Sequence, residues 1–485
     1  MEVSLRENSP LTSPPTERPK AGILHFGPGA FFRAFNAIYT AEAMAHSGGN
    51  WGIRAVSLRS AGIRDTLAAQ HYIYTAAMLM PDGIEYTQVD VIDSILVAPE
   101  NPQAVLAALC EANIRIVSLT ITEKGYCFDP ATNGLDHNNP DIMHDLDHPE
   151  TPRTAIGFLV YGLAQRRAAG LPPFTVLSCD NLPSNGALVR RMVLELAHAV
   201  DPSLADWIGA EARFPSTMVD RITPATTARD IENLRQAIGI DDSGCVVHEP
   251  FRQWVIEDDF VKDDHPNWAA AGAQMVTSVD AFELMKLRCL NGSHSTLAYL
   301  GYLAGYKTIA AAMCDTRFAD LLTRLWAREI IPTIPTPEGE DLHAYCHALQ
   351  ERYKNPSIHH KTSQIAMDGS QKLPQRLLGA ISDNLKMGNS APLLCLAVAG
   401  WMRYVGGTDE LGQEIDVQDP MAQQLRNAVI KSTRPEEAVQ ALLGIEAIFD
   451  PELAQNPKFE ASVTTAYISL LEHGTLKTIE RELYA

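Results

Sequence analysis

The stretch AGILHFGPGAFFR, residues 21–33, decides the fold class of the chain. Ala21 to Gly27 is an apolar run that ends in glycine, which is typical of a buried strand, and residues 29–47 have the pattern of a helix. A strand that turns through glycines into a helix is the setting of a dinucleotide-binding fingerprint. The glycines permit a tight turn and let backbone N–H groups approach a pyrophosphate at the helix N-terminus.

The same alternation continues through the first half of the chain. Further predicted strands are Trp51–Arg59, Arg115–Thr122 and Phe174–Asp180, and predicted helices are 102–112 and 152–169. Short apolar strands between amphipathic helices indicate βαβ units and a doubly wound parallel sheet. From about Phe282 onward, helical patterns follow one another and strands are scarce.

These patterns predict an α/β chain with a Rossmann-like sheet domain followed by a mostly α-helical domain. The expected parts are a flexible arm at 1–20, a dinucleotide-binding domain at 21–280 and a helical domain at 281–485. A chain of 485 residues is too long for one ordinary core, which agrees with two domains.

The composition restricts the class of protein. The formal net charge of −20 argues against a nucleic-acid partner. Eight cysteines without a C-x-x-C pair indicate neither a zinc site nor a disulfide framework, so we expect no metal. The chain offers no signal peptide and no apolar run of about 18 residues, which predicts a cytoplasmic protein without a membrane partner.

The fingerprint itself is incomplete, because Phe32 stands where the third glycine is usual. As a cofactor site it would comprise Gly27, Gly29, Ala30, Phe31, Phe32 and Arg33. The alternative is an ordinary strand–helix turn that binds nothing. An acid that holds the ribose 2′-hydroxyl is expected after the second strand, but this place reads Arg59-Ser60-Ala61-Gly62. Arg59 would tolerate a 2′-phosphate, so these residues leave NAD and NADP open.

Asn181 in FTVLSCDNLPSNG, residues 174–186, follows a predicted strand. Ligands of open α/β sheets bind outside the carboxyl ends of the strands, where a side-chain amide can reach a substrate. The alternative is local turn chemistry, for which Asn and Asp are common.

Lys286, Asn291 and His294 occur together in KLRCLNGSH, residues 286–294. On an α-helix Asn291 would lie about 140° from Lys286 and His294 about 80° from it, so the three fall on one broad side. A lysine that exchanges a proton, an amide that polarises an oxygen and an imidazole that orients a hydroxyl can perform carbonyl chemistry. The alternative is a solvated helix face.

Taken together, the motifs resemble the polyol-specific long-chain dehydrogenase family, which includes mannitol dehydrogenases and fructuronate reductases. The resemblance runs from about residue 21 to 475. Its segments include HFGPGAFFRAF at 25, VSLTITEKGYC at 117, VLSCDNLPSNG at 176, MVDRITP at 218, EPFRQWVIEDDF at 249 and MKLRCLNGSHSTLAYLGYLAGY at 285. It implies NAD as cofactor, a sugar acid or polyol as substrate, an active site between the two domains and no zinc.

The resemblance also implies a role for individual residues. Lys286 matches the catalytic lysine, Asn181 and Asn291 the oxyanion-stabilising asparagines, and His294 the substrate-orienting histidine. Asp220 matches an active-site aspartate, Glu283 a proton-relay glutamate and Lys372 a substrate-binding lysine.

One segment departs from the mannitol dehydrogenases. Gln364 replaces an arginine that contacts substrate there, and the basic stretch from His359 to Arg376 looks more like the fructuronate reductases. A carboxylate taken out of water needs cationic or multiple hydrogen-bonding partners. We therefore expect a sugar-acid substrate whose carboxylate is held by His360 or Lys361 together with Lys372, with Gln364 and Arg376 also at the substrate site. The alternative is a solvated basic loop of which Lys372 alone faces the substrate. The alternatives are a neutral polyol substrate and, more remotely, a sugar-acid sensor without catalysis.

Overall fold

The structure, a computed structural model, describes residues 18–484, and most of the predicted arm therefore lies outside the described residues. The described chain divides into two compact units, one ending at Asp280 and the other beginning at Ala281. Each unit is described by itself below.

The first unit is built on a five-stranded sheet of order β5-β2-β1-β6-β9 in which all neighbours are parallel. Its strands are β1 (Ala21–Phe26), β2 (Gly52–Ser57), β5 (Ile92–Val97), β6 (Ile116–Leu119) and β9 (Thr175–Ser178). In register, Ile23 pairs with Ile53 on one side and with Ile116 on the other. The predicted doubly wound α/β fold is confirmed.

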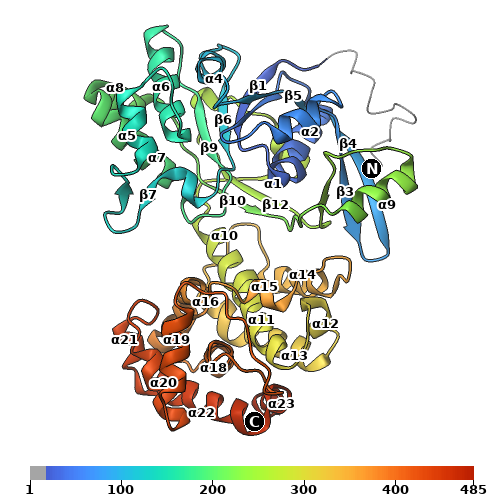
Figure 1. Ribbon diagram of the computed structural model, residues 1–485, viewed down its shortest axis with the longest axis vertical. Coiled ribbons are helices and arrows are strands. Elements are labelled where there is room, and N and C mark those ends of the chain that lie inside the picture. The colour runs from blue at the N-terminus through green and yellow to red at the C-terminus, as the bar shows by residue number, and fades with distance from the viewer. Residues whose placement is uncertain (1–17, 485) are drawn as a thin grey trace. The chain divides into compact units, whose positions relative to one another are not determined.

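Helices cover both faces of this sheet (Figure 1). Successive residues of a strand point to opposite faces, so Ile23 packs with α2 (Asn36–Ser47) while Leu24 packs with the other layer. That other layer contains α4 (Pro102–Leu109), α6 (Ala155–Ala168) and α7 (Asn185–Val200). Burial on both faces explains why the strands read as continuous apolar runs in the sequence.

Two three-stranded sheets and the two-stranded pair β7-β8 complete the unit, and none of them was predicted. One has the order β11-β3-β4 and the other β10-β12-β13. Their strands are β3 (Tyr74–Met80), β4 (Gly83–Val89), β11 (Val246–His248), β10 (Thr217–Asp220), β12 (Gln253–Glu257) and β13 (Gln274–Val276). The remaining elements are α3 (Gly62–Ala68), β7 (Phe128–Asp129), β8 (Gly134–Leu135), α5 (Pro140–Asp147), α8 (Pro202–Glu211) and α9 (Ala228–Ile238).

The second unit is helical, as predicted. Its α-helices are α10 (Asp280–Met285), α11 (Ser293–Leu303), α12 (Ile309–Met313), α13 (Thr316–Leu325), α14 (Leu342–Lys354), α15 (Thr362–Ile365), α16 (Gly369–Leu373), α17 (Gly379–Lys386), α18 (Pro392–Val405), α19 (Ala422–Ile430), α20 (Pro435–Leu443), α21 (Pro451–Ala454), α22 (Pro457–His473) and α23 (Thr475–Tyr484). Helix α18 is buried along nearly its whole length and packs against α11 and α22, so it forms the centre of this unit (Figure 1).

Three segments of the second unit are π-helical, with i→i+5 hydrogen bonds in place of i→i+4. They are Lys286–Gly292, Trp326–Ile330 and Pro374–Leu378. The first lies between α10 and α11, so the chain runs from Asp280 to Leu303 as one helix with a π-helical middle. Within residues 18–484 we find no helix with the length and apolar character that a membrane crossing requires.

Candidate active site

The loop after β1 has the geometry of a dinucleotide turn. Gly27 adopts a φ of +93°, and a Cβ at this position would lie 2.1 Å from the carbonyl oxygen of Thr120. Gly29 is different, because a Cβ there would meet nothing closer than the Gly27 carbonyl oxygen at 3.9 Å. The first helical hydrogen bond runs from Arg33 N to Gly29 O at 3.2 Å. The N–H groups of residues 30–32 precede it and have no intrahelical acceptor, which suits an anionic ligand.

The side chains of α1 (Ala30–Ala34) serve mainly to fix the turn. The Phe32 ring is 1% exposed and stacks on His25 with the ring centroids 3.6 Å apart. Arg33 is buried, donates to the carbonyl oxygen of Gly244 and lies over the Tyr74 ring. Any cofactor contact of this segment would therefore come from its backbone and from the space beside Gly29. The single helix predicted for 29–47 is wrong, because Phe35 has non-helical angles and separates α1 from α2.

Arg59 follows β2 and is exposed. The nearby Arg64 is paired with Asp65 at 2.8 Å and with Glu100, whereas no ion pair involves Arg59 among the described residues. The end of β2 therefore has no acid to hold a ribose 2′-hydroxyl, and the Arg59 guanidinium group there forms no ion pair within residues 18–484.

Asn181 lies directly after β9 and is exposed. Its neighbour Asp180 is buried and accepts hydrogen bonds from Ile121 N at 2.9 Å, Thr122 N at 2.9 Å and Tyr126 Oη at 2.7 Å. Burial raises the pKa of the Asp180 carboxyl, and these three bonds oppose the rise. Asp180 thus joins the carboxyl ends of β6 and β9. Sequence reasoning missed this role, because no spacing links two strand ends about 60 residues apart.

Asp220 ends β10 and is buried, at 5% exposure. It belongs to the first unit, as do Asn181 and the loop after β1. Glu283 lies in α10 of the second unit and is half-buried.

Lys286, Asn291 and His294 occupy one helical run, but not with the predicted angles. The segment from Lys286 to Gly292 is a π-helix, in which residue i+5 lies close to one full turn from residue i. A π-helix turns by roughly 80° per residue, so Asn291 lies only about 50° from Lys286 around the helix axis. The next three residues are α-helical and bring His294 to nearly the same side of the axis as Lys286. The angles predicted for an α-helix are therefore wrong, and the structure groups the three residues more tightly.

Lys286 is 8% exposed and Asn291 is half-buried. The side chain of His294 is buried, and its Nε2 atom has no hydrogen-bond partner within residues 18–484. An unpaired buried polar atom is costly and is expected where a ligand supplies the missing partner.

The surroundings of His294 are cationic. Its ring centroid lies 5.2 Å from that of His360, and Arg376 Nη1 donates to the hydroxyl of the adjacent Ser295 at 3.2 Å. Burial holds the pKa of His294 well below its ordinary value, and its neighbours His360, Arg376 and Arg352 lower it further. The imidazole is therefore neutral at pH 7. Arg352, at the end of α14, was not among the predicted site residues, because it belongs to no motif.

The other predicted substrate-binding residues differ in their accessibility. Lys361 and Gln364 are exposed. Lys372 is half-buried, and its Nζ donates to the Met367 carbonyl oxygen at 2.6 Å and lies 3.8 Å from an Asp368 carboxylate oxygen. Burial, followed by the charge of Arg376, lowers the pKa of Lys372. Burial and the charge of Arg352 lower the pKa of His360, so the cations near His294 are Arg376 and Arg352.

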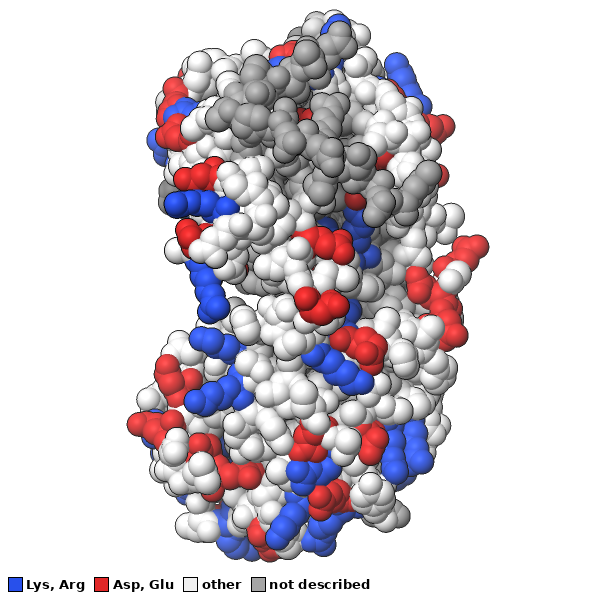
Figure 2. All heavy atoms as spheres, turned by 90° about the vertical axis from the view of Figure 1, so that its right-hand side faces the viewer, with Lys and Arg blue, Asp and Glu red and all other residues white. Residues whose placement is uncertain are grey.

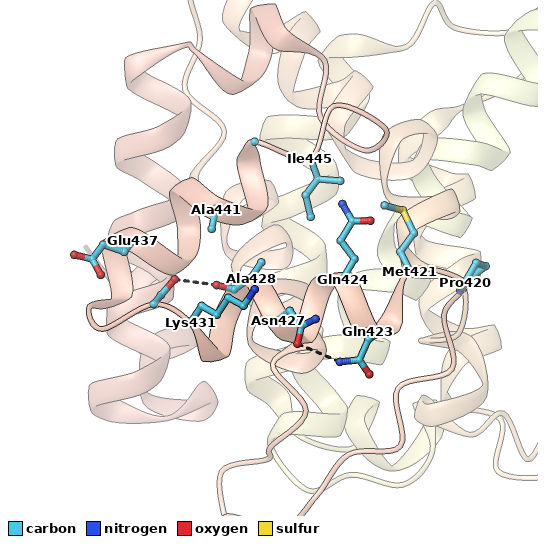
Figure 3. Close-up of a pocket in the computed structure, with 12 residues that line it drawn as sticks. Pro420, Met421, Gln423, Gln424, Asn427, Ala428, Lys431, Glu437, Ala441 and Ile445 are labelled. Carbon is cyan, nitrogen blue, oxygen red and sulfur yellow. Dashed lines mark hydrogen bonds between the residues drawn. The ribbon is translucent and has the colours of Figure 1, made fainter.

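A cavity of about 960 Å³ lies elsewhere in the second unit, between α19 and α20 (Figure 3). Gln424, Asn427, Lys431 and Ile445 are among the residues that line it, and none of the predicted site residues does. Its lining includes Lys431 and Glu437, but the unpartnered Nε2 atom of the buried His294 makes the residues around Lys286 the better candidate for chemistry.

No group of three or more His, Cys, Asp or Glu side chains is placed to hold a metal ion in the described part of the chain. On the face drawn in Figure 2, acidic and basic side chains are interspersed, and no continuous basic surface is visible among its described residues.

A Rossmann-type sheet with a glycine turn after β1, followed by a helical unit with a buried lysine, is characteristic of nicotinamide-dependent dehydrogenases. The sequence matches the mannitol dehydrogenase Rossmann domain over residues 21–270 and the mannitol dehydrogenase C-terminal domain over residues 278–471. The chain belongs to the mannitol dehydrogenase family and is an NAD-dependent oxidoreductase.

Known relatives cover almost the whole chain. D-mannonate oxidoreductase of Escherichia coli (strain K12) is 45% identical over 488 residues, which is 99% of this chain and 99% of that protein. The mannitol 2-dehydrogenase of Pseudomonas fluorescens, solved as a ternary complex with NAD and D-mannitol, is 39% identical with a TM-score of 0.81, covering 96% of this chain and 95% of that one. A D-sorbitol dehydrogenase structure in substrate-free form is 33% identical with a TM-score of 0.89, covering 95% of each chain.

Proposed function

We propose that this enzyme is a fructuronate reductase, which interconverts D-fructuronate and D-mannonate with NAD(H). The observation that carries the proposal is the cationic group beside His294, formed by Arg376 and Arg352 in a chain of net charge −20. Cations that are partly removed from water in an acidic protein require an anionic partner, and a substrate carboxylate provides one.

In this proposal Lys286 is the acid/base group. Bound nicotinamide supplies the hydride for reduction of the C5 carbonyl. Asn291 and Asn181 donate hydrogen bonds to the oxygen as it gains negative charge. Lys286 then delivers the proton, and in the reverse direction it accepts one. The reverse direction needs the neutral amine of Lys286, whose side chain is buried at 8% exposure.

His294 orients the substrate. Its unpaired Nε2 atom is available to a substrate hydroxyl, and its neutral state allows that atom either to donate or to accept. We assign Asp220 and Glu283 the family roles of active-site aspartate and proton relay.

Cofactor binding is assigned to the backbone of residues 27–33, with Gly29 leaving room for the pyrophosphate. We propose NAD as the preferred cofactor, as the NAD complex of the Pseudomonas relative favours. Arg59 is exposed after β2 and there is no acid beside it, so discrimination against NADP is expected to be modest.

The carboxylate is assigned to His360 and Arg376, with Lys372 at the margin, and Lys361 contributes long-range attraction from its exposed position. The alternative substrate is a neutral polyol such as mannitol, which the names of the relatives also support. A sensor without catalysis is the remote alternative, and the presence of Lys286, Asn291 and His294 together argues against it.

His360→Gln tests the carboxylate assignment. We expect it to weaken D-fructuronate binding by about 10- to 100-fold, since a hydrogen bond to a charged group contributes roughly 1.5–3 kcal/mol. Activity on neutral D-fructose should change far less. Lys361→Met should show the same selectivity with a smaller loss.

His359→Gln is the matched control, because His359 is the exposed neighbour of His360. KM and kcat for both substrates are measured for all three variants. Equal losses on the charged and the neutral substrate would show that His360 supports the fold and does not bind the acid.

A further inference from the structure

The π-helix from Lys286 to Gly292 is held by side chains from other parts of the second unit. The carbonyl oxygen of Cys289 accepts a hydrogen bond from Trp326 Nε1 at 2.9 Å. The carbonyl oxygen of Leu290 accepts one from Tyr353 Oη at 2.9 Å. The hydroxyl of Ser293 donates back to Cys289 O as well. π-Helices are rare and occur mostly as single turns. We therefore expect these hydrogen bonds from outside the segment to stabilise its π-helical form.

Tyr353, in the last turn of α14, has a second contact in addition to this hydrogen bond. Its ring stacks on the imidazole of His294, with the centroids 4.8 Å apart and the planes 26° apart. Its Oη atom also lies 2.9 Å from Ser293 Oγ. The side chain is 4% exposed, so these contacts are made in the interior. One tyrosine therefore contacts both a backbone carbonyl of the π-helix and the ring of His294.

The π geometry matters for the relative placement of Lys286 and Asn291. In the π-helix the two residues differ by about 50° around the axis, and in an α-helix of the same sequence they would differ by about 140°. Conversion of this segment to α-helical hydrogen bonding would therefore turn the Asn291 amide away from the Lys286 amino group by about 90°. It would also shift His294 relative to both.

We propose that Tyr353 is a positioning residue, which keeps residues 286–292 π-helical through its hydroxyl and holds the His294 ring through its own ring. The inference rests on the proposed roles of Lys286, Asn291 and His294. Tyr353 itself touches no reacting atom. It acts on hydride transfer by keeping the oxyanion donor and the substrate-orienting imidazole beside the acid/base group.

The hydroxyl contact can be removed while the ring contact is kept. Tyr353→Phe keeps the ring stacked on His294 and removes the bond to Leu290 O, whereas Tyr353→Leu removes both contacts. Tyr404→Phe is the matched control, because Tyr404 is an equally buried tyrosine of the same unit, on α18, whose ring packs against Tyr299 and Tyr302 and not against His294.

The experiment measures kcat, KM and the isotope effect on kcat with NADH deuterated at the transferred position, in the holoenzyme and well below the unfolding temperature. We expect Tyr353→Phe to lower kcat roughly tenfold, to leave KM for NADH within about twofold and to raise the isotope effect, because misplaced donors slow the hydride step itself. Tyr353→Leu should also raise KM for the sugar substrate. Tyr404→Phe should keep wild-type values.

The inference is overturned if Tyr353→Phe and Tyr404→Phe have the same kcat and the same isotope effect, or if Tyr353→Phe loses only thermal stability. The proposed function fails separately. If the proposed function is wrong, the wild-type enzyme does not reduce D-fructuronate, and the tyrosine variants are compared with D-fructose as the substrate that accepts the hydride.

Discussion

Gly27 and Gly29 stand two residues apart in the loop after β1 and meet different physical demands. Gly27 has a left-handed backbone, and a Cβ there would overlap the Thr120 carbonyl oxygen. Gly29 has a φ of −71° and open space where a Cβ would project. Of these two positions, the fold requires glycine at 27 alone. At position 29 the absence of a side chain leaves the backbone accessible to a ligand.

Exchanging each glycine for alanine should separate stability from cofactor binding. Gly29→Ala should unfold at the wild-type temperature and bind NADH about tenfold or more weakly, because a methyl group fills the place of close pyrophosphate approach. Gly27→Ala should lower Tm or prevent folding. Alanine stabilises a protein by roughly 1 kcal/mol where the backbone accepts it, and the strain of alanine at position 27 exceeds that gain. Thermal unfolding and NADH fluorescence titration provide both readouts. Wild-type NADH affinity in Gly29→Ala would refute the cofactor assignment.

Lys286→Ala should abolish chemistry and spare cofactor binding. We expect turnover to fall by about 10²–10⁴, the range of a positioned acid/base group. The exposed Lys386 of α17 offers a control, because Lys386→Ala removes the same side chain from the same unit without touching residues 286–294. Steady-state rates and NADH binding are compared for both. A folded Lys286→Ala enzyme with near-normal turnover would remove Lys286 from the mechanism.

At the scale of elements, sequence reasoning succeeded where periodicity carries the information. The strands around Ile23, Val117 and Val176 are buried on both faces and read as apolar runs. Strand β5 and all strands of the two three-stranded sheets were missed. Two of these, β11 and β13, have only three residues each, which is too short for a periodic pattern. The π-helix at Lys286 was missed for a different reason. Its register depends on partners such as Tyr353 and Trp326, which are distant in sequence.

Glu329 shows a similar dependence of one element on another. It lies in the π-helix Trp326–Ile330, and its two carboxylate oxygens accept hydrogen bonds from Leu393 N at 2.9 Å and Leu394 N at 2.8 Å. It thereby caps the N-terminus of α18, whose own N-cap residue is Ala391 and has no side-chain cap bond. Burial raises the pKa of Glu329 to about 7, although these two bonds lower it.

The raised pKa makes a testable contribution to stability. Between the ordinary carboxyl pKa of 4.5 and about 7, folded Glu329 keeps a proton that the unfolded chain releases. The stabilisation is therefore complete below the lower value and is lost as the pH rises through 7. The Tm advantage of the wild type over Glu329→Gln should shrink between pH 5.5 and pH 8. Glu446→Gln, at an exposed position, is the control. A constant or growing advantage would contradict this assignment.

At the scale of the whole molecule, the fold class and the family were predictable from the sequence because their motifs are local and ordered along the chain. The cationic surroundings of His294 were predictable only in part. The basic stretch containing His360 and Arg376 is visible in the sequence, whereas Arg352 and Tyr353 reach His294 from α14 and carry no signature. In the sequence, Lys361 and His360 were equivalent candidates for binding the carboxylate. In the structure Lys361 is exposed and His360 is half-buried.

The central claim is that an enzyme of net charge −20 selects an anionic sugar through a small cationic group. The most direct test is NADH oxidation by the wild-type enzyme with D-fructuronate, with D-fructose and without substrate. Two charge-assisted contacts of roughly 1.5–3 kcal/mol each predict a kcat/KM at least about 100-fold higher for D-fructuronate than for D-fructose. A higher kcat/KM for D-fructose, or no NADH oxidation above the substrate-free rate with D-fructuronate, would contradict it.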